Sequence, residues 1–425
     1  MIHKLLSLSL FRSTAVYTIA NIVNSSIPFL LIPILTRYLT KADYGIIAMF
    51  PVVTNLLTPL IGLNTHVAIS IQYFHQDKID LPKFVYNCFL ILLGTSVVTC
   101  LFFFLFKNFI SDMSHFPLQW IWLFPVFCFF QFISQVLLVL WINQAQPVKY
   151  GIFQVLQTVL NFVLSLVLVI EADFDWRGRI IGQATATILA GCVALYIIYK
   201  SKLIKPEPDI PYIKKAVRFG LPLVPTTLSV FVITMTDRIF ITQMIGVSST
   251  GEYALGYQIG MILGILSDSY NNAWGPWLLK SLKENKLAVK IKIVKYTYLY
   301  FLALIFAGLF ISLSAPWFFD LFIGKEFRNA TIYIIWIVMG FVFSGMYKTV
   351  SNYIYFIEKS QILMWITVIA AVLNIILNYV FIKVNGAVGA AQATTVVNFV
   401  FFLLTWLAAI KYFRMPWFSF FKVVK

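Results

Sequence analysis

Acidic residues are scarce in this chain of 425 residues, which has 16 Asp and Glu against 32 Lys and Arg. Soluble domains are about 25% charged and about 45–50% apolar, whereas this chain is 11% charged and 60% hydrophobic. This composition excludes a soluble enzyme and a disordered chain. The net charge of +16 arises from missing acids rather than from abundant bases, so it does not indicate a nucleic-acid-binding protein.

Cysteine pairs and catalytic motifs are also absent from the sequence. The four cysteines, Cys88, Cys100, Cys128 and Cys192, lie inside apolar runs without the C-x-x-C spacing of redox or metal sites. The sequence has no G-x-x-x-x-G-K-[ST] phosphate loop and no H-E-x-x-H zinc motif. We therefore expect a protein that is not an enzyme, with no catalytic residues, no metal and no cofactor.

Long apolar runs are what the sequence has in abundance. A bilayer core needs about 20 mostly apolar residues per helix, and the runs are continuous, unlike the alternating strands of a β-barrel. We predict an all-α integral membrane protein of about twelve transmembrane helices, the first of which is an uncleaved span and not a signal peptide. The predicted spans are 14–35, 44–67, 85–106, 118–142, 151–170, 179–199, 219–243, 252–276, 296–315, 329–353, 362–382 and 388–410.

The Lys and Arg residues are distributed unevenly over the predicted loops. With twelve spans both termini lie on one side, and this side collects 22 of the 32 Lys and Arg residues, including six in 200–218 and six in 280–295. Eight lie on the other side, and Arg238 and Lys348 lie inside spans. Because loops rich in Lys and Arg stay in the cytoplasm, we predict that both termini are cytoplasmic.

The two halves of the chain resemble each other. VLNFVLSLVLVI at 159–170 matches VLNIILNYVFIK at 372–383, which places Asn161 and Asn374 at a spacing of 213 residues. Six spans separate the two copies, an even number, so both copies have the same orientation. We therefore predict two six-helix lobes, related by a parallel pseudo-repeat around a central cavity. They are 1–199 and 219–410, joined by a basic cytoplasmic linker at 200–218 and followed by a cytoplasmic tail at 411–425.

Several segments are typical of one transporter family. They are LTRYLTKADYGIIAM (35–49), GLNTHVAISIQYF (62–74), FGLPLVPTTLSVFVITMTDRIFI (219–241), GEYALGYQIG (251–260) and NNAWGPWL (271–278). Through them the chain resembles the polysaccharide-export branch of the multidrug/oligosaccharidyl-lipid/polysaccharide exporter superfamily.

The resemblance implies a Wzx-type flippase of the bacterial inner membrane. Such a flippase moves an undecaprenyl-pyrophosphate-linked oligosaccharide from the cytoplasmic to the periplasmic leaflet, for O-antigen or other surface polysaccharide biosynthesis. The implied partners are this lipid-linked glycan, membrane lipid, and a polysaccharide polymerase with its chain-length regulator. Two alternatives are an ion-coupled multidrug exporter of the same superfamily and a membrane glycan polymerase or ligase.

Ionisable side chains within the spans are the candidate transport residues, because in lipid they are costly and face a cavity or a partner. Arg238 and Lys348 suit a pyrophosphate, and Arg37 lies near the outer end of the first span. Asp237 and Asp268 have two open roles. They either line the cavity or neutralise a cation and hold two helices together. Snorkelling to the surface is a further possibility for Lys348.

Three other polar residues are candidates. Asn21 and Asn24 must face protein or water, so they either make interhelical hydrogen bonds or line the cavity. His66 titrates near neutrality and, with Asp268, is a candidate for coupling to a H⁺ or Na⁺ gradient; a hydrogen-bonded histidine at a helix end is the alternative. The G-x-x-x-G-x-x-x-G run at 256–264 predicts a close helix contact.

Overall fold

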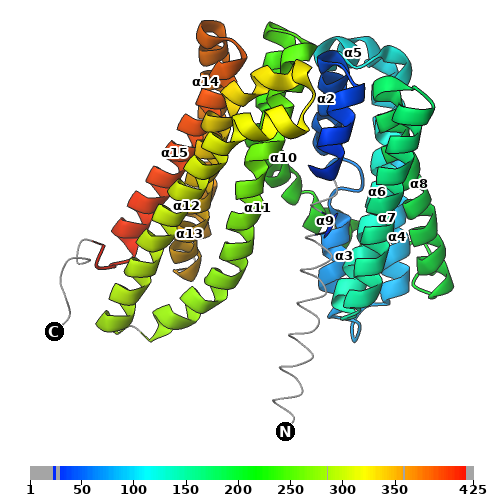
Figure 1. Cartoon of the computed structure of the whole chain (residues 1–425). Helices are drawn as coiled ribbons and strands as arrows, with labels where there is room; N and C mark the ends of the chain where they lie inside the picture. The colour runs from blue at the N-terminus through cyan, green and yellow to red at the C-terminus, as the bar shows by residue number, and fades with distance from the viewer. Residues whose placement is uncertain (1–22, 25–28, 285, 358, 418–425) are drawn as a thin grey trace. The chain divides into compact units, whose positions relative to one another are not determined.

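The computed structural model describes residues 23–24, 29–284, 286–357 and 359–417, and within these ranges the secondary structure is helical, without strands. This confirms the predicted all-α class. The helices are Phe29–Tyr38, α2 (Lys41–Leu57), α3 (Thr65–Tyr73), α4 (Leu81–Leu105), α5 (Lys107–Ser114), α6 (Leu123–Asn143), α7 (Pro147–Leu166), α8 (Asp175–Lys200), α9 (Ile210–Gly220), α10 (Leu223–Met244), α11 (Val247–Lys283), α12 (Leu287–Phe322), α13 (Thr331–Phe356), α14 (Ser360–Asn385) and α15 (Ala387–Tyr412) (Figure 1). Short 3₁₀ or π turns lie at Leu118–Trp120, Val167–Glu171 and Lys325–Ala330.

Nine helical stretches in the described part of the chain are long and apolar enough to cross a membrane. They coincide with nine of the twelve predicted spans. The remaining three are 14–35, which falls mostly outside the described residues, 252–276, which lies within the less apolar α11, and 44–67. The chain is therefore a multi-pass membrane protein.

The structure divides the predicted span 44–67 into two helices. α2 ends at Leu57 and α3 begins at Thr65. Between them Gly62, Leu63 and Asn64 have φ values of +77°, +48° and +54°, a left-handed conformation that no α-helix contains. The freed backbone N–H of Gly62 donates instead to the Thr95 hydroxyl on α4 at 2.9 Å. The hydropathy of the run does not show this break, although Gly62 and Asn64 are residue types that tolerate a left-handed backbone.

The chain forms two compact units, Met1–Phe231 and Val232–Lys425, and the boundary lies within α10. In the first unit, buried aromatic side chains of α2 and α6 make up much of the core: the Phe50 ring lies 5.3 Å from that of Phe124 and 5.0 Å from that of Phe127. The predicted linker 200–218 leads into α9, which packs against α3 and α4 of this unit. The lobe boundaries drawn from the sequence stay a prediction.

In the second unit a row of glycines on α11 faces α13. A Cβ added to Gly260 would lie 2.6 Å from Cγ2 of Ile337, and one added to Gly264 would lie 2.9 Å from the Phe341 ring. A Cβ added to Gly256 would lie 3.2 Å from the Ala330 carbonyl oxygen and 3.3 Å from Cβ of Tyr333. The close helix contact predicted at 256–264 is thus confirmed.

The repeat between the two halves appears in the way two helical hairpins close. In the hairpin of α7 and α8, Gly178 packs on the backbone of Leu168; in the hairpin of α14 and α15, Gly389 packs on the backbone of Phe381. Leu168 and Phe381 are 213 residues apart, the spacing that also relates Asn161 to Asn374. Each hairpin therefore uses a glycine of its second helix to approach the corresponding backbone of its first helix, although the two glycines are themselves 211 residues apart.

Candidate functional site

Asp237 and Arg238 form a closed ion pair on α10. Arg238 Nη1 donates to Asp237 Oδ1 at 3.2 Å and to the Thr234 carbonyl at 2.9 Å. The Tyr253 hydroxyl donates to the other carboxylate oxygen of Asp237, and the Tyr257 ring lies 4.3 Å from the guanidinium carbon. Both charged side chains are buried.

The guanidinium of Arg238 is therefore already neutralised and covered by aromatic rings. Adjacent helical residues project about 100° apart, yet the long arginine side chain folds back to its neighbour. Asp237 neutralises the cation next to it in the chain, and its contact with a second helix is the hydrogen bond from Tyr253 of α11. Removing either partner would leave a buried charge unpaired, which costs about 3–5 kcal/mol.

Lys348 and Asp268 form a more open ion pair between α13 and α11. Lys348 Nζ lies 2.5 Å from Asp268 Oδ1, and the two side chains are 27% and 60% exposed. One turn along, Asn352 donates to Asn271 Oδ1 at 2.9 Å. The structure thus brings together two predicted site residues that are 80 positions apart in the chain.

The exposure of Asp268 indicates the environment of this face of the second unit. Asp268 lies close to the middle of α11, where an ionised carboxylate in contact with lipid would be strongly disfavoured. A largely exposed carboxylate at this place must therefore meet water or a polar partner. Asn272, one turn further, is exposed as well. The α11–α13 face carrying Asp268 is therefore polar, with the Lys348 ammonium and the exposed Asn272 beside the carboxylate.

The candidate residues of the first predicted span, 14–35, and its outer end belong to the first unit. Arg37 is exposed at the end of the helix Phe29–Tyr38, and Asn21 lies outside the described residues. The Asn24 side-chain carbonyl accepts a hydrogen bond from the Thr158 hydroxyl on α7. For Asn24 this is the interhelical hydrogen bond that was one of its two expected roles.

His66 is half-buried near the start of α3. Its ring lies edge-on to Phe132, with centroids 5.6 Å apart, and its Nδ1 has no hydrogen-bond partner in the described part of the chain. A histidine hydrogen-bonded at a helix end was one expected role of His66, and among the described residues its Nδ1 makes no such bond. The described ranges also contain no group of three His, Cys, Asp or Glu side chains placed to hold a metal ion.

Arg179 is a cation that the loop-charge count placed outside the spans. It lies in α8, where its Nη1 donates to Asn161 Oδ1 at 2.6 Å and to Ser165 Oγ at 2.8 Å, both on α7. At the repeat-related place in the second unit, Asn378 donates to Asn374 Oδ1 at 3.1 Å. The recurring asparagine in an otherwise apolar span was the sequence signal for this buried polar contact.

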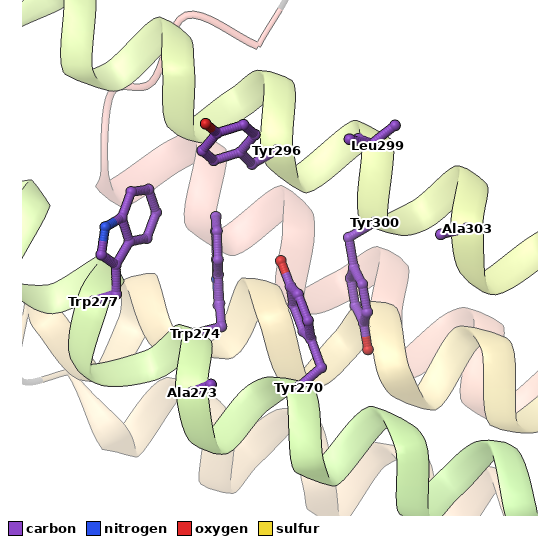
Figure 2. Close-up of a pocket in the computed structure, with 8 residues that line it drawn as sticks. All are labelled: Tyr270, Ala273, Trp274, Trp277, Tyr296, Leu299, Tyr300 and Ala303. Carbon is purple, nitrogen blue, oxygen red and sulfur yellow. The ribbon is translucent and has the colours of Figure 1, made fainter.

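An aromatic pocket of about 580 Å³ lies between α11 and α12. Its lining residues are Tyr270, Ala273, Trp274, Trp277, Tyr296, Leu299, Tyr300 and Ala303. Figure 2 shows the rings of α11 and α12 facing each other across the pocket, and the Tyr270 and Tyr300 rings stack with centroids 3.7 Å apart. The spacing of aromatic residues on α11 (270, 274, 277) is helical and could have revealed it. Such walls suit a hydrocarbon chain or an aromatic ligand.

Ion pairs and polar side chains within the helices of a multi-pass membrane protein indicate a functional site there, and the family and fold matches below place the chain in the class of membrane transporters. Two solved structures share its fold. One is "Lipid II flippase MurJ, inward closed conformation", with a TM-score of 0.73 and 15% identity, covering 94% of this chain and 87% of that one. The other is "Inward-facing conformation of a multidrug resistance MATE family transporter of the MOP superfamily", with a TM-score of 0.71 and 14% identity, covering 93% and 94%.

The family follows from the sequence matches. Residues 10–282 match the family described as "Polysaccharide biosynthesis protein", and residues 222–380 match the family named MatE. The chain belongs to the polysaccharide biosynthesis protein family. Similar curated proteins of Haemophilus influenzae are an "Uncharacterized membrane protein", 25% identical over 397 residues and covering 92% of each chain, and "Lsg locus putative protein 1", 21% identical over 415 residues and covering 93% and 98%.

Proposed function

We propose that this protein is a flippase that moves undecaprenyl-pyrophosphate-linked oligosaccharide repeat units from the cytoplasmic to the periplasmic leaflet by alternating access. It would work in the bacterial inner membrane with both termini in the cytoplasm, as the distribution of Lys and Arg over the loops indicates. The polysaccharide biosynthesis family and the fold shared with a lipid II flippase support this proposal. Its product would supply a polymerase and chain-length regulator that build O-antigen or another surface polysaccharide.

The open ion pair of Lys348 and Asp268 carries the proposal. A pyrophosphate needs cationic partners to leave the headgroup region, and Lys348 is the described intramembrane cation that combines partial exposure with an exposed carboxylate partner. In our mechanism the pyrophosphate displaces Asp268 from the Lys348 ammonium on the polar face of α11 and α13. Arg238, closed off by Asp237 and Tyr253, would contribute only in another conformation.

Coupling to a H⁺ or Na⁺ gradient fits the same pair. Protonation of Asp268, or its binding of Na⁺, would release Lys348 for the substrate. His66 is the second candidate for a proton-coupled step, because its Nδ1 is unpartnered among the described side chains.

A charge swap tests the proposal in a strain lacking the chromosomal copy. Lys348→Gln, Asp268→Asn and the double variant K348D/D268K are compared at matched protein levels. We expect Lys348→Gln to abolish surface glycan, with lipid-linked repeat units accumulating in the cytoplasmic leaflet. The double variant keeps an ion pair between the two helices but places the ammonium on α11, so we expect it to be stably expressed and inactive. Full export by the double variant would show that the pair is only structural.

The multidrug exporter remains a second candidate function, favoured by the MatE match over residues 222–380 and by the aromatic pocket between α11 and α12. The same deletion strain separates the two. A flippase deletion leaves drug sensitivity unchanged and removes glycan, whereas deletion of an exporter sensitises cells to cationic or aromatic drugs and leaves surface glycan intact.

A further inference from the structure

The short helix α9 presents two chemically different faces. Its inner face packs on the core of the first unit through Tyr212, Ile213, Ala216 and Val217, which are buried or half-buried. The Tyr212 ring lies 5.8 Å from that of Phe84 on α4. At 100° per residue these four positions fall on one side of the helix. α9 is therefore held firmly on the first unit.

The outer face of α9 is basic and apolar. Lys214, Lys215 and Arg218 are all exposed and lie on the side opposite the core. They are flanked by Ile210, which is 67% exposed, and by Phe219, which is exposed as well. No acidic residue occurs in α9. We call these five residues the outer face of α9.

The acidic residues near α9 are already used by other cations. Asp209 Oδ2 lies 2.8 Å from Lys83 Nζ, and Lys205 Nζ lies 3.0 Å from Glu207 and 3.3 Å from Asp80. In the described part of the chain, the three cations of the outer face therefore have no carboxylate partner of their own. Their charge is available to a partner outside the protein.

We propose that the outer face of α9 binds the surface of an anionic phospholipid membrane. An interfacial helix of this kind buries apolar side chains among the acyl chains while its cations meet lipid phosphates. The position of α9 fits, because only two residues separate its end at Gly220 from the start of the apolar helix α10 at Leu223. Since apolar Ile210 and Phe219 flank the cations, a lipid surface fits this face better than a soluble acidic protein. The inference holds whichever substrate the protein transports.

The test uses the full-length chain in vesicles, with a polarity-sensitive fluorophore on a cysteine at position 211. The label is attached through Pro211→Cys, because Pro211 is exposed in the first turn of α9 on the same side as the three cations. The accessible Cys100 and Cys192 are first replaced by serine. The probes are spin-labelled phosphatidylglycerol, which is anionic, and spin-labelled phosphatidylcholine, which is zwitterionic. We expect a blue-shifted emission that is quenched more strongly by the anionic lipid, with the difference lost in high salt.

Two triple variants assign the effect to the cations. K214Q/K215Q/R218Q should lose the preference for phosphatidylglycerol, whereas the charge-conserving K214R/K215R/R218K should keep it. K290Q/K292Q/K295Q removes the same charge from α12 and should leave the label unaffected. Equal quenching by the two lipids, or a label that stays in water in both membranes, would overturn the proposal. The latter result would point to a soluble partner instead. Both triple variants change the same three exposed residues and leave the inner face untouched, so a preference kept in the charge-conserving variant and lost in the glutamine variant assigns the effect to the charge.

Discussion

The glycine contact between α11 and α13 leads to a quantitative prediction for Gly260→Ala. The added methyl would lie 2.6 Å from Cγ2 of Ile337, a buried side chain. Ile337 is β-branched and therefore has little rotamer freedom in a helix, so it cannot move aside without shifting α13. Overpacking of this kind costs about 1–3 kcal/mol. The better helix propensity of alanine returns about 0.5–1 kcal/mol.

Gly94→Ala is the matched control. Gly94 lies inside α4, and a Cβ there would meet no atom within 4 Å. Only the propensity gain remains at this position, so Gly94→Ala should be neutral or stabilising by about 0.4–1 kcal/mol. The difference between the two variants isolates the steric cost at Gly260.

Thermal unfolding of the purified full-length chain, followed by the fluorescence of its 11 tryptophans, measures both variants. We expect a lower Tm for Gly260→Ala than for the wild type and an unchanged or higher Tm for Gly94→Ala. In an Ile337→Ala background the Gly260→Ala substitution should cost less, because the opposing methyl group is gone. An equal cost in both backgrounds, or none at all, would refute the steric argument.

Two further predictions concern polar contacts of the first unit. Arg179→Leu removes the donor to Asn161 and Ser165 and should lower the free energy of unfolding by about 1–3 kcal/mol. Arg177 is an exposed neighbour, so Arg177→Leu should have little effect. Equal Tm values for the two variants would contradict this prediction. The second concerns pH. The hydrogen bond from Lys83 lowers the pKa of Asp209, so its stabilising contribution is present above the ordinary aspartate pKa and is lost as the pH falls through the lowered value. Hydrogen bonds to Glu207 and Asp80 raise the pKa of Lys205, so its contribution is lost as the pH rises through the raised value. Amide hydrogen exchange over 203–209, corrected for intrinsic rates, should therefore be slowest at a pH between the lowered pKa of Asp209 and the raised pKa of Lys205. Protection that does not change in acid would argue against the role of Asp209.

Most of the fold could be predicted from the apolar runs, because a chain in lipid must satisfy its backbone hydrogen bonds within each helix. The break at Gly62–Asn64 does not follow from hydropathy, because the run 44–67 as a whole is apolar. Gly62 and Asn64 tolerate the left-handed backbone, but their residue types alone do not show that a helix ends there. The hydrogen bond from Gly62 to Thr95 depends on a distant helix that hydropathy does not register.

The sequence predicts which residues belong to the candidate site, but it does not predict which of them pair with each other. Charge within a span marked Arg238 and Lys348, but whether a cation is covered or open depends on which side chains surround it. Arg238 is covered by tyrosines from α11, and Lys348 reaches a carboxylate that lies far away in the sequence. The apolar runs place Arg179 at a loop because it lies at the boundary of a predicted span, where a shift of a few residues changes the environment of the side chain.

The ion pair of Lys348 and Asp268 and the glycine row lie on the same two helices, α11 and α13. The glycines fix the spacing of these helices through contacts that leave no room for sliding, whereas the ion pair is partly exposed and its partners can be exchanged. Binding and release of an anion at Lys348 could therefore change the charge of this surface without altering the distance between the helices. The ion pair that exchanges its partners and the glycine packing that sets the helix spacing would then do separate work on neighbouring turns of the same two helices.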